Sequence, residues 1–374
     1  MAVTTLTLKN LDKQYTLLEY LRPYGISAPC GGKGKCGKCL VKVNGQYVSA
    51  CSTRMEGDIS VEIDEPLYGS GVTAAVDIGT TNVVVLIDGK TLLKEPNAQR
   101  SFGADVLTRI EACRDGHGEE LTSLIRNQVK RLTGNAELFI SGNTVMELLY
   151  MGYDVTSIGV PPFTPATLTP GSNMAPCVSG YVGGDVVAGL ATISEDPPYL
   201  FVDIGTNGEI ALVEKDGIET CACAAGPAFE YGAAGLKGSE VIDEVARLKR
   251  EGLLGKSGKL RGNSVLTQDD IHSVQLAKGA VRGAIETLLG NKKVDKLFIA
   301  GDFGGALNIE NAVEIGLLPE CDTTVLGNTS LKGAQAALDG RVNLKEIADR
   351  CTYTDLSSSK VFSNLFLRYL NFEQ

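Results

Sequence analysis

The sequence has no apolar run long enough to cross a membrane, because none reaches the roughly 18 residues that a spanning helix requires. The N-terminus also lacks the basic segment followed by an apolar segment that is typical of a secretory signal. These absences favour a cytoplasmic protein with no membrane partner. Basic residues are in deficit as well: 35 Lys and Arg stand against 45 Asp and Glu, for a net charge of −10. Such a balance excludes a general nucleic-acid binder, which needs basic stripes to neutralise phosphates.

A second absence concerns nucleotide binding. The chain contains no G-x-x-x-x-G-K-[S/T] loop, which excludes a P-loop protein. What is present is a globular composition, with 43% hydrophobic and 21% charged residues in 374. That length predicts two or three domains.

Four of the ten cysteines form a tight group with the spacing C-x5-C-x2-C-x11-C. Disulfides are rare in a reducing cytoplasm, so this group indicates metal or redox chemistry. Four thiolates suit either tetrahedral zinc or a 2Fe–2S cluster. Structural zinc sites usually come as two C-x2-C knuckles, whereas here three cysteines share one Gly-rich loop. The loop resembles that of plant-type ferredoxins with one residue inserted, and also the 2Fe–2S domains of molybdenum hydroxylases. The resemblance implies a 2Fe–2S cluster held by Cys30, Cys36, Cys39 and Cys51.

The residues around this loop predict a small α+β domain over residues 1–66. Strands are expected at 3–8, 40–43, 46–49 and 59–63, a short helix at 17–22, and a hairpin turn at Asn44-Gly45. With the cysteine loop, this order predicts a ferredoxin-like (β-grasp) fold. Residues 67–72 have linker composition.

The rest of the chain contains an internal repeat. An apolar strand, an Asp-Ile-Gly-Thr turn and a second apolar strand occur at 73–87 and again at 199–213. The repeat predicts an α/β fold with two similar halves, 73–198 and 199–374, the second ending in a strand and a helix. Gly79 and Gly205 permit tight turns whose N–H groups face an anion, and the turns would clamp nucleotide phosphates between them. Asp77 and Asp203 are expected to orient Mg2+ or water. The expected phosphate contacts are Thr80, Thr81, Thr206 and Asn207.

Two further segments complete the predicted nucleotide site. A strand at 296–300 runs into a Gly-rich turn, where the adenosine is expected to lie against Gly301, Asp302, Gly304 and Gly305. A helix is expected over the Gly183-Gly184-Asp185 segment that precedes the second repeat. Asp185 is a candidate for orienting the attacking water, with a helix N-cap as the alternative.

These motifs carry a family resemblance. DIGTT, GGDVVAGL, DIGTN and AGDFGG resemble the phosphate-1, connecting-helix, phosphate-2 and adenosine motifs of the acetate and sugar kinase, heat-shock and actin superfamily. With the ferredoxin-like domain in front, the whole chain resembles the ATP-dependent reductive activators of corrinoid proteins. It is shorter than the longer activators and lacks a C-terminal four-cysteine run.

The resemblance implies an actin-like ATPase that uses ATP and Mg2+ to return corrinoid cobalt of a methyltransferase system from Co(II) to Co(I). Its partners would be a corrinoid protein and a low-potential donor such as a ferredoxin or flavodoxin, and the oligomeric state stays open, a homodimer included. Three alternatives remain: an activator of another low-potential acceptor such as a dehydratase, a small-molecule kinase with a redox-sensing ferredoxin domain, and a chaperone-like ATPase.

Lysines crowd the cysteine loop at positions 33, 35, 38 and 42. They constitute either a solvated face or a docking rim for an acidic partner.

Overall fold

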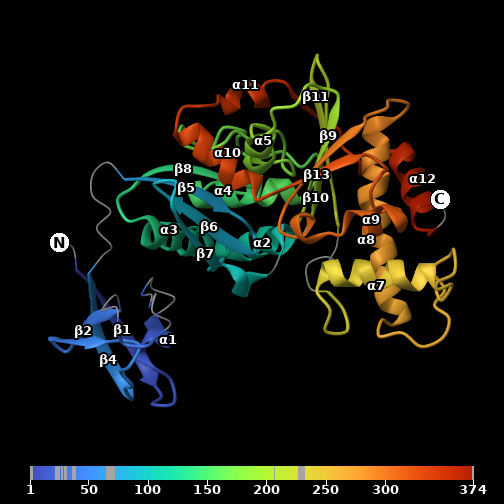
Figure 1. Cartoon of the computed structure of the whole chain (residues 1–374). Coiled ribbons are helices and arrows are strands. Elements are labelled where there is room, and N and C mark those ends of the chain that lie inside the picture. The colour runs from blue at the N-terminus through green and yellow to red at the C-terminus, as the bar shows by residue number, and fades with distance from the viewer. Residues whose placement is uncertain are drawn as a thin grey trace.

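The computed structural model describes residues 3–21, 26, 28, 32–35, 39–64, 72–103, 105–205, 207–225 and 232–372. Figure 1 shows a small N-terminal domain followed by a larger part with two lobes. Three predicted site residues, Cys30, Cys36 and Thr206, lie outside the described residues, as does Lys38.

The N-terminal domain is a four-stranded sheet covered by one short helix. The strands are β1 (Val3–Leu11), β2 (Leu40–Val43), β3 (Gln46–Ser49) and β4 (Gly57–Asp64), in the order β1-β4-β2-β3. The predicted turn at Asn44-Gly45 joins β2 to β3, and both residues have positive φ, as a two-residue hairpin requires. Helix α1 (Leu17–Leu21) buries its three leucines against the sheet.

The first lobe contains the first repeat. Its sheet has the order β7-β6-β5-β8, with β5 (Thr73–Ile78), β6 (Asn82–Ile87), β7 (Thr91–Pro96) and β8 (Glu137–Gly142). Helix α3 (Gly118–Thr133) packs on one face through its apolar side chains. Helix α2 (Val106–Ala112) runs through a π-helical segment, Cys113–His117, into α3, and α4 (Thr144–Met151) follows β8. One-turn helices lie at Arg100–Phe102 and Thr156–Gly159.

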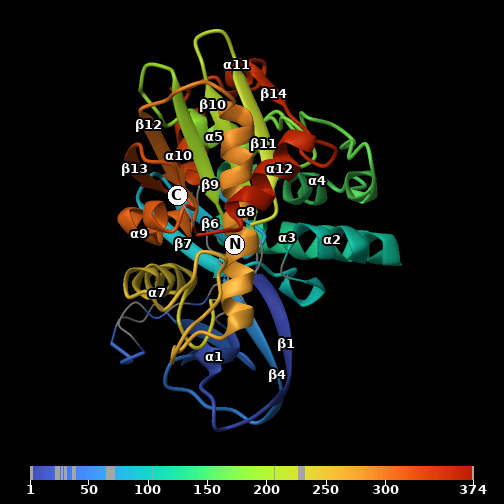
Figure 2. The same cartoon turned by 90° about the vertical axis from the view of Figure 1, so that its right-hand side faces the viewer.

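The second lobe contains the second repeat. Its sheet has the order β13-β12-β9-β10-β11-β14. The strands are β9 (Tyr199–Ile204), β10 (Gly208–Val213), β11 (Ile218–Cys223), β12 (Lys296–Ala300), β13 (Asp322–Gly327) and β14 (Cys351–Tyr353). Helices α7 (Gly238–Arg250) and α8 (Gln268–Leu289) cover one face, and α5 (Gly184–Leu190) packs on the other. Figure 2 shows α12 (Lys360–Tyr369) lying alongside α8. The remaining helices are Gly304–Ala306, α9 (Ile309–Glu314), α10 (Thr329–Leu338) and α11 (Leu344–Ala348).

Helix α10 connects the two lobes. It follows β13 of the second lobe, yet Leu331 and Ala334 pack on Ala75 and Val84 of the first sheet. Helix α10 also packs against α5 so closely that a Cβ on Gly333 would lie 2.0 Å from the Ala188 carbonyl oxygen. The first sheet is therefore covered on its second face by an element from the far end of the chain.

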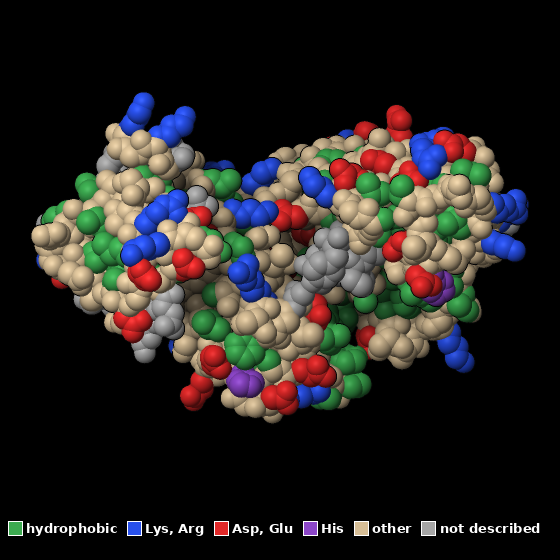
Figure 3. Space-filling view, turned by 90° about the horizontal axis from the view of Figure 1, so that it is seen from below, with side chains coloured by type: hydrophobic (Ala, Val, Ile, Leu, Met, Phe, Trp, Pro, Cys, Tyr) green, Lys and Arg blue, Asp and Glu red, His purple; other side chains and the backbone are tan. Residues whose placement is uncertain are grey.

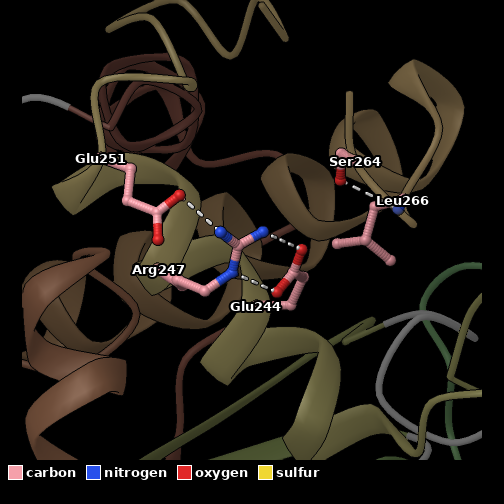
Figure 4. Close-up of polar contacts among 5 residues, drawn as sticks. All are labelled: Glu244, Arg247, Glu251, Ser264 and Leu266. Atoms are coloured by element: carbon pink, nitrogen blue, oxygen red, sulfur yellow. Dashed lines mark hydrogen bonds and ion pairs between the residues drawn. The ribbon is translucent and has the colours of Figure 1, made fainter. Parts of the chain in front are cut away.

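Charged side chains form ion pairs on the outer surface of α7. Arg247 donates to Glu244 at 2.7 and 2.8 Å and to Glu251 at 2.5 Å (Figure 4). Figure 3 shows acidic and basic side chains interspersed over the face it presents, without a stripe of one sign.

Candidate functional site

A cavity of about 470 Å³ lies between the two lobes, and both Asp-Ile-Gly-Thr hairpins open onto it. The two repeats that the sequence separates by more than a hundred residues therefore meet at one site. The lining residues are Asp77, Gly79, Thr80, Thr81, Asn82, Val84, Asn143, Asp185, Asp203, Gly205, Asn207, Glu209, Lys237, Gly238, Ser239, Gly301, Asp302, Phe303, Ala306, Asn328, Thr329 and Ser330.

Asp77 is the penultimate residue of strand β5 and is held from the opposite lobe. Asn328 Nδ2 donates to one of its carboxylate oxygens at 2.7 Å and Ser330 Oγ donates to the other at 2.8 Å. Burial raises the pKa of Asp77, and these two hydrogen bonds act in the opposite direction. Asp77 is thus tied to the first turn of α10, a contact that its position in the sequence did not suggest.

The second hairpin differs from the first in length. Ile204 pairs with Gly208, leaving three residues in the turn, whereas Ile78 pairs with Val83, leaving four. The shorter turn sets Glu209 directly opposite Asp203 on one face of the sheet, where the first hairpin has Val84 opposite Asp77. Sequence reasoning missed Glu209, although the strand alternation after a short turn was a signal for it.

The adenosine motif approaches the second hairpin very closely. Gly301 has φ +88°, and a Cβ there would lie 2.4 Å from Asp203 Oδ1, so glycine is required at this point. Gly301 and Asp302, two of the residues expected to contact the adenosine, line the cavity. Gly304 and Gly305 instead lie in the following one-turn helix, outside the residues that line the cavity.

Asp185 lies in the first turn of α5 and faces the cavity. The N-cap of this helix is Gly183, so the alternative that Asp185 caps the helix is wrong; its carboxylate instead accepts from the Val186 N–H at 2.9 Å. Burial raises the pKa of Asp185 to about 7. A carboxylate that titrates near neutral pH can accept a proton from water, which is the role expected of a general base.

One lysine lines this acidic cavity and another pairs with a carboxylate that lines it, and the sequence analysis identified neither. Lys94, from β7 of the first lobe, pairs with Asp302 of the second lobe at 2.7 Å. Lys237 lines the cavity at the start of α7. Both are cations that a polyphosphate would meet on entering between the lobes.

The buried carboxylates predict how stability changes with pH. Burial, with Asp185 as the foremost neighbouring charge, raises the pKa of Asp203 to about 8. The folded protein therefore binds protons that the unfolded chain has already released between about pH 4 and 8. We expect the melting temperature in Mg2+-free, nucleotide-free buffer to fall as the pH rises through this range. Asp203→Asn removes one of the titrating groups and should flatten the slope; equal slopes for variant and parent would contradict the assignment.

The cluster loop is described in part. Cys39 immediately precedes β2 and is 1% exposed, while Cys51 follows β3 and is 8% exposed. The Ala50 N–H donates to the Cys39 carbonyl at 2.9 Å, so the hairpin brings the two cysteine segments together. Gly32 of the loop passes over Cys51, since a Cβ on it would lie 3.9 Å from Cys51 Cβ. Two buried thiols under one loop suit a thiolate-bound cluster. With Cys30 and Cys36 outside the described residues, no set of three or more metal-binding side chains is found among the residues described.

Of the lysines near this loop, Lys33 and Lys35 are exposed, whereas Lys42 pairs with Glu62 at 2.8 Å. Lys42 is thus engaged within the sheet, which leaves Lys33 and Lys35 as the exposed described members of the predicted rim.

Three protein-family models match separate parts of the chain and together cover most of it. Residues 3–62 match the 2Fe-2S iron-sulfur cluster binding domain. Residues 72–175 match the RACo middle region, and residues 198–234 and 261–374 match the C-terminal domain of RACo, the ASKHA domain. These matches place a 2Fe-2S binding domain, the RACo middle region and the RACo C-terminal domain in this order along the chain. The predicted order of a ferredoxin-like domain followed by an actin-like ATPase fold is confirmed.

Individual relatives agree with this assignment. The chain is 27% identical over 394 aligned residues to the corrinoid activation enzyme RamQ of Eubacterium limosum, covering 75% of this chain and 65% of RamQ. It is 24% identical to the [Co(II) methylated amine-specific corrinoid protein] reductase of Methanosarcina barkeri, covering 53% of this chain and 51% of that reductase. The chain thus spans less than two thirds of the length of these relatives. A solved reductive activator for corrinoid, iron-sulfur protein superposes with a TM-score of 0.68 and 25% identity, over 96% of both chains.

The RACo-type assignment gives the chain a 2Fe–2S binding domain and a nucleotide-binding fold. None of the helices in the described residues is both long enough and apolar enough to cross a bilayer.

Proposed function

We propose that this protein is an ATP-dependent reductive activator that reduces the Co(II) of a corrinoid protein to Co(I). The observation that carries the proposal is the combination, in one chain, of a ferredoxin-type cysteine loop and a two-lobed nucleotide cavity, in the domain order of the RACo family. The names of the relatives give corrinoid proteins as their targets.

Within this proposal, each part of the chain has a separate task. The four cysteines Cys30, Cys36, Cys39 and Cys51 hold a 2Fe–2S cluster, which supplies one low-potential electron. The two hairpins would hold the phosphates of ATP, and Asp77 and Asp203 would hold Mg2+, which favours carboxylate and water ligands and would offset phosphate charge. Asp185 accepts the proton of the attacking water. Lys94 and Lys237 offset the phosphate charge.

ATP is needed because the electron transfer is uphill. Plant-type clusters lie near roughly −400 mV, and a one-electron step of ~60 mV corresponds to about 1.4 kcal/mol. A potential difference of a few such steps between the cluster and the cobalt corresponds to a free energy close to the ~1–3 kcal/mol by which two bound ligands typically couple, or slightly above it. Closure of the lobes around ATP would favour one state of the bound corrinoid protein, and ATP hydrolysis would then release that protein.

The direct test is anaerobic loss of the Co(II) spectrum of a co-encoded cobalamin protein, with a reductant for the cluster. We expect loss with Mg–ATP and little loss with Mg–ADP. An ATP-independent rate would contradict the proposal, and ATP-dependent phosphorylation of a small molecule without any protein partner would favour the kinase alternative.

Charge near the cluster loop should govern how fast the partner docks. Replacing Lys33 and Lys35 with glutamate is expected to slow Co(II) reduction at low salt. Rim charges act mainly on association, and 0.1 M salt screens charges beyond roughly 10 Å, so the difference from the parent should shrink as salt is added. The measurement is the reduction rate against salt concentration.

A matched control is Lys13→Glu, because Lys13 lies in the same domain but pairs with Glu56 at 2.6 Å. Basal ATP hydrolysis should be unchanged in every variant. Equal low-salt rates for the double variant and the parent would eliminate the docking rim.

A further inference from the structure

The first hairpin has a buried polar network behind it that neither the motifs nor the comparisons assign. Its members, Asn97, Gln99 and Arg109, are fully buried. Asn97 and Gln99 follow strand β7, and Arg109 lies in α2. Buried polar groups are retained where hydrogen bonds satisfy them, so their partners indicate what the network holds.

The partners are the carbonyl groups of three successive hairpin residues. Asn97 Nδ2 donates to the Gly79 carbonyl at 2.8 Å, and Arg109 Nη2 donates to the Thr80 carbonyl at 3.1 Å. The Asn97 N–H donates to the Thr81 carbonyl at 2.9 Å. All three carbonyl groups of the Gly-Thr-Thr turn therefore point toward the network and accept hydrogen bonds from it.

This arrangement fixes the direction of the amide hydrogens. In a planar trans peptide unit the C=O and the N–H of the next residue point in opposite directions. Holding the Gly79 and Thr80 carbonyls against the network consequently directs the N–H groups of Thr80 and Thr81 away from it, and both residues line the cavity. Amides aligned in this way are an anion-binding arrangement.

Arg109 also has an unusual electrostatic setting. Its hydrogen-bond partners among the described residues are neutral: Thr80, the Gly103 carbonyl at 3.0 Å, Gln99 Oε1 at 2.5 Å and the Met146 sulfur at 3.9 Å. Burial lowers the pKa of Arg109 to about 10, and the charge of Asp105 acts in the opposite direction, so Arg109 remains charged at neutral pH. A fixed positive charge thus lies directly behind the turn.

We propose that Arg109 is a positioning residue of the nucleotide site, which holds the first hairpin with its amides toward the phosphates and adds positive potential there. The ligand it serves is the polyphosphate of a nucleoside di- or triphosphate. This inference rests on the proposed nucleotide function. The second hairpin is built differently, since its turn is closed by the Gly205 N–H donating to its own Asn207 carbonyl at 2.9 Å.

The test measures how tightly the full-length Arg109→Met variant binds ligands with and without phosphates. Arg109→Met removes the positive charge behind the turn and the hydrogen bonds to the Thr80 and Gly103 carbonyls and to Gln99. It is expected to weaken Mg–ATP and Mg–ADP binding roughly tenfold to hundredfold. Adenosine binding should stay near that of the parent. Arg109→Lys keeps the charge but not the forked geometry, so it should bind Mg–ATP with intermediate affinity and serves if the methionine variant does not fold.

Two control variants separate positioning from general destabilisation. Ile110→Val shortens a buried neighbour in the same helix, and Arg131→Met removes an arginine of the same lobe that pairs with Glu95 at 2.6 Å. Both should keep the parent's dissociation constants. Parent-like Mg–ATP binding by Arg109→Met and Arg109→Lys, or equal weakening of ATP and adenosine, would overturn the inference. A parent that binds no nucleotide at all would instead refute the proposed function.

Discussion

Cys39→Ala is expected to abolish the iron–sulfur cluster and, with it, all reduction of Co(II). Anaerobically purified parent should contain about two iron and two labile sulfides per chain, as a four-thiolate 2Fe–2S site requires. Cys39 is almost fully buried immediately before β2, and alanine supplies no ligand in its place. The measurements are iron, labile sulfide and visible absorbance, followed by the Co(II) assay.

The control is Cys321→Ala, which removes a thiol of the second lobe that donates to the Val294 carbonyl. It should keep the parent's iron and activity. ATP hydrolysis should persist in Cys39→Ala, because the nucleotide cavity is formed by other residues. Stoichiometric zinc without labile sulfide in the parent would refute the cluster assignment.

Asp203→Ala is expected to lower ATP hydrolysis by at least about 100-fold, the scale seen when one preorganised electrostatic group is removed from an active site. Asp203 lies at the second hairpin in contact distance of the adenosine motif and opposite Glu209, so its loss affects both the metal and the turn. The cluster spectrum should not change. Adding ATP should no longer stimulate Co(II) reduction, which should stay at the low rate seen without nucleotide.

Asp322→Asn is the matched control, because Asp322 begins β13 of the same lobe and is exposed. Its ATPase rate should equal that of the parent. Retention of hydrolysis in both Asp77→Ala and Asp203→Ala would refute the two-hairpin phosphate clamp.

The site was predictable wherever its residues are local in the sequence. The Asp-Ile-Gly-Thr turns can be recognised from the sequence, because an apolar strand, a glycine turn and a second apolar strand are typical of a hairpin. Gly301 was likewise found from its motif, and the structure shows the close approach that requires it.

Contacts made by distant segments could not be predicted in the same way. Asn328 and Ser330 reach Asp77 across some 250 residues, and their sequence context is an ordinary helix start. Arg109 lies in a short amphipathic helix between Thr108 and Ile110, and an arginine in such a helix normally faces solvent. Only the packing of α2 behind the first hairpin makes it a buried cation.

Helix α10 has a consequence for how the protein can be divided. A cut between residues 198 and 199 would separate the two repeats, yet the fragment with the first repeat would lose the helix that covers Ala75 and Val84 and holds Asp77. The other fragment would expose the apolar face of α10. We therefore expect the halves to be stable only as a complementing pair, and a circular permutant opened at that junction to fold where the separate halves do not.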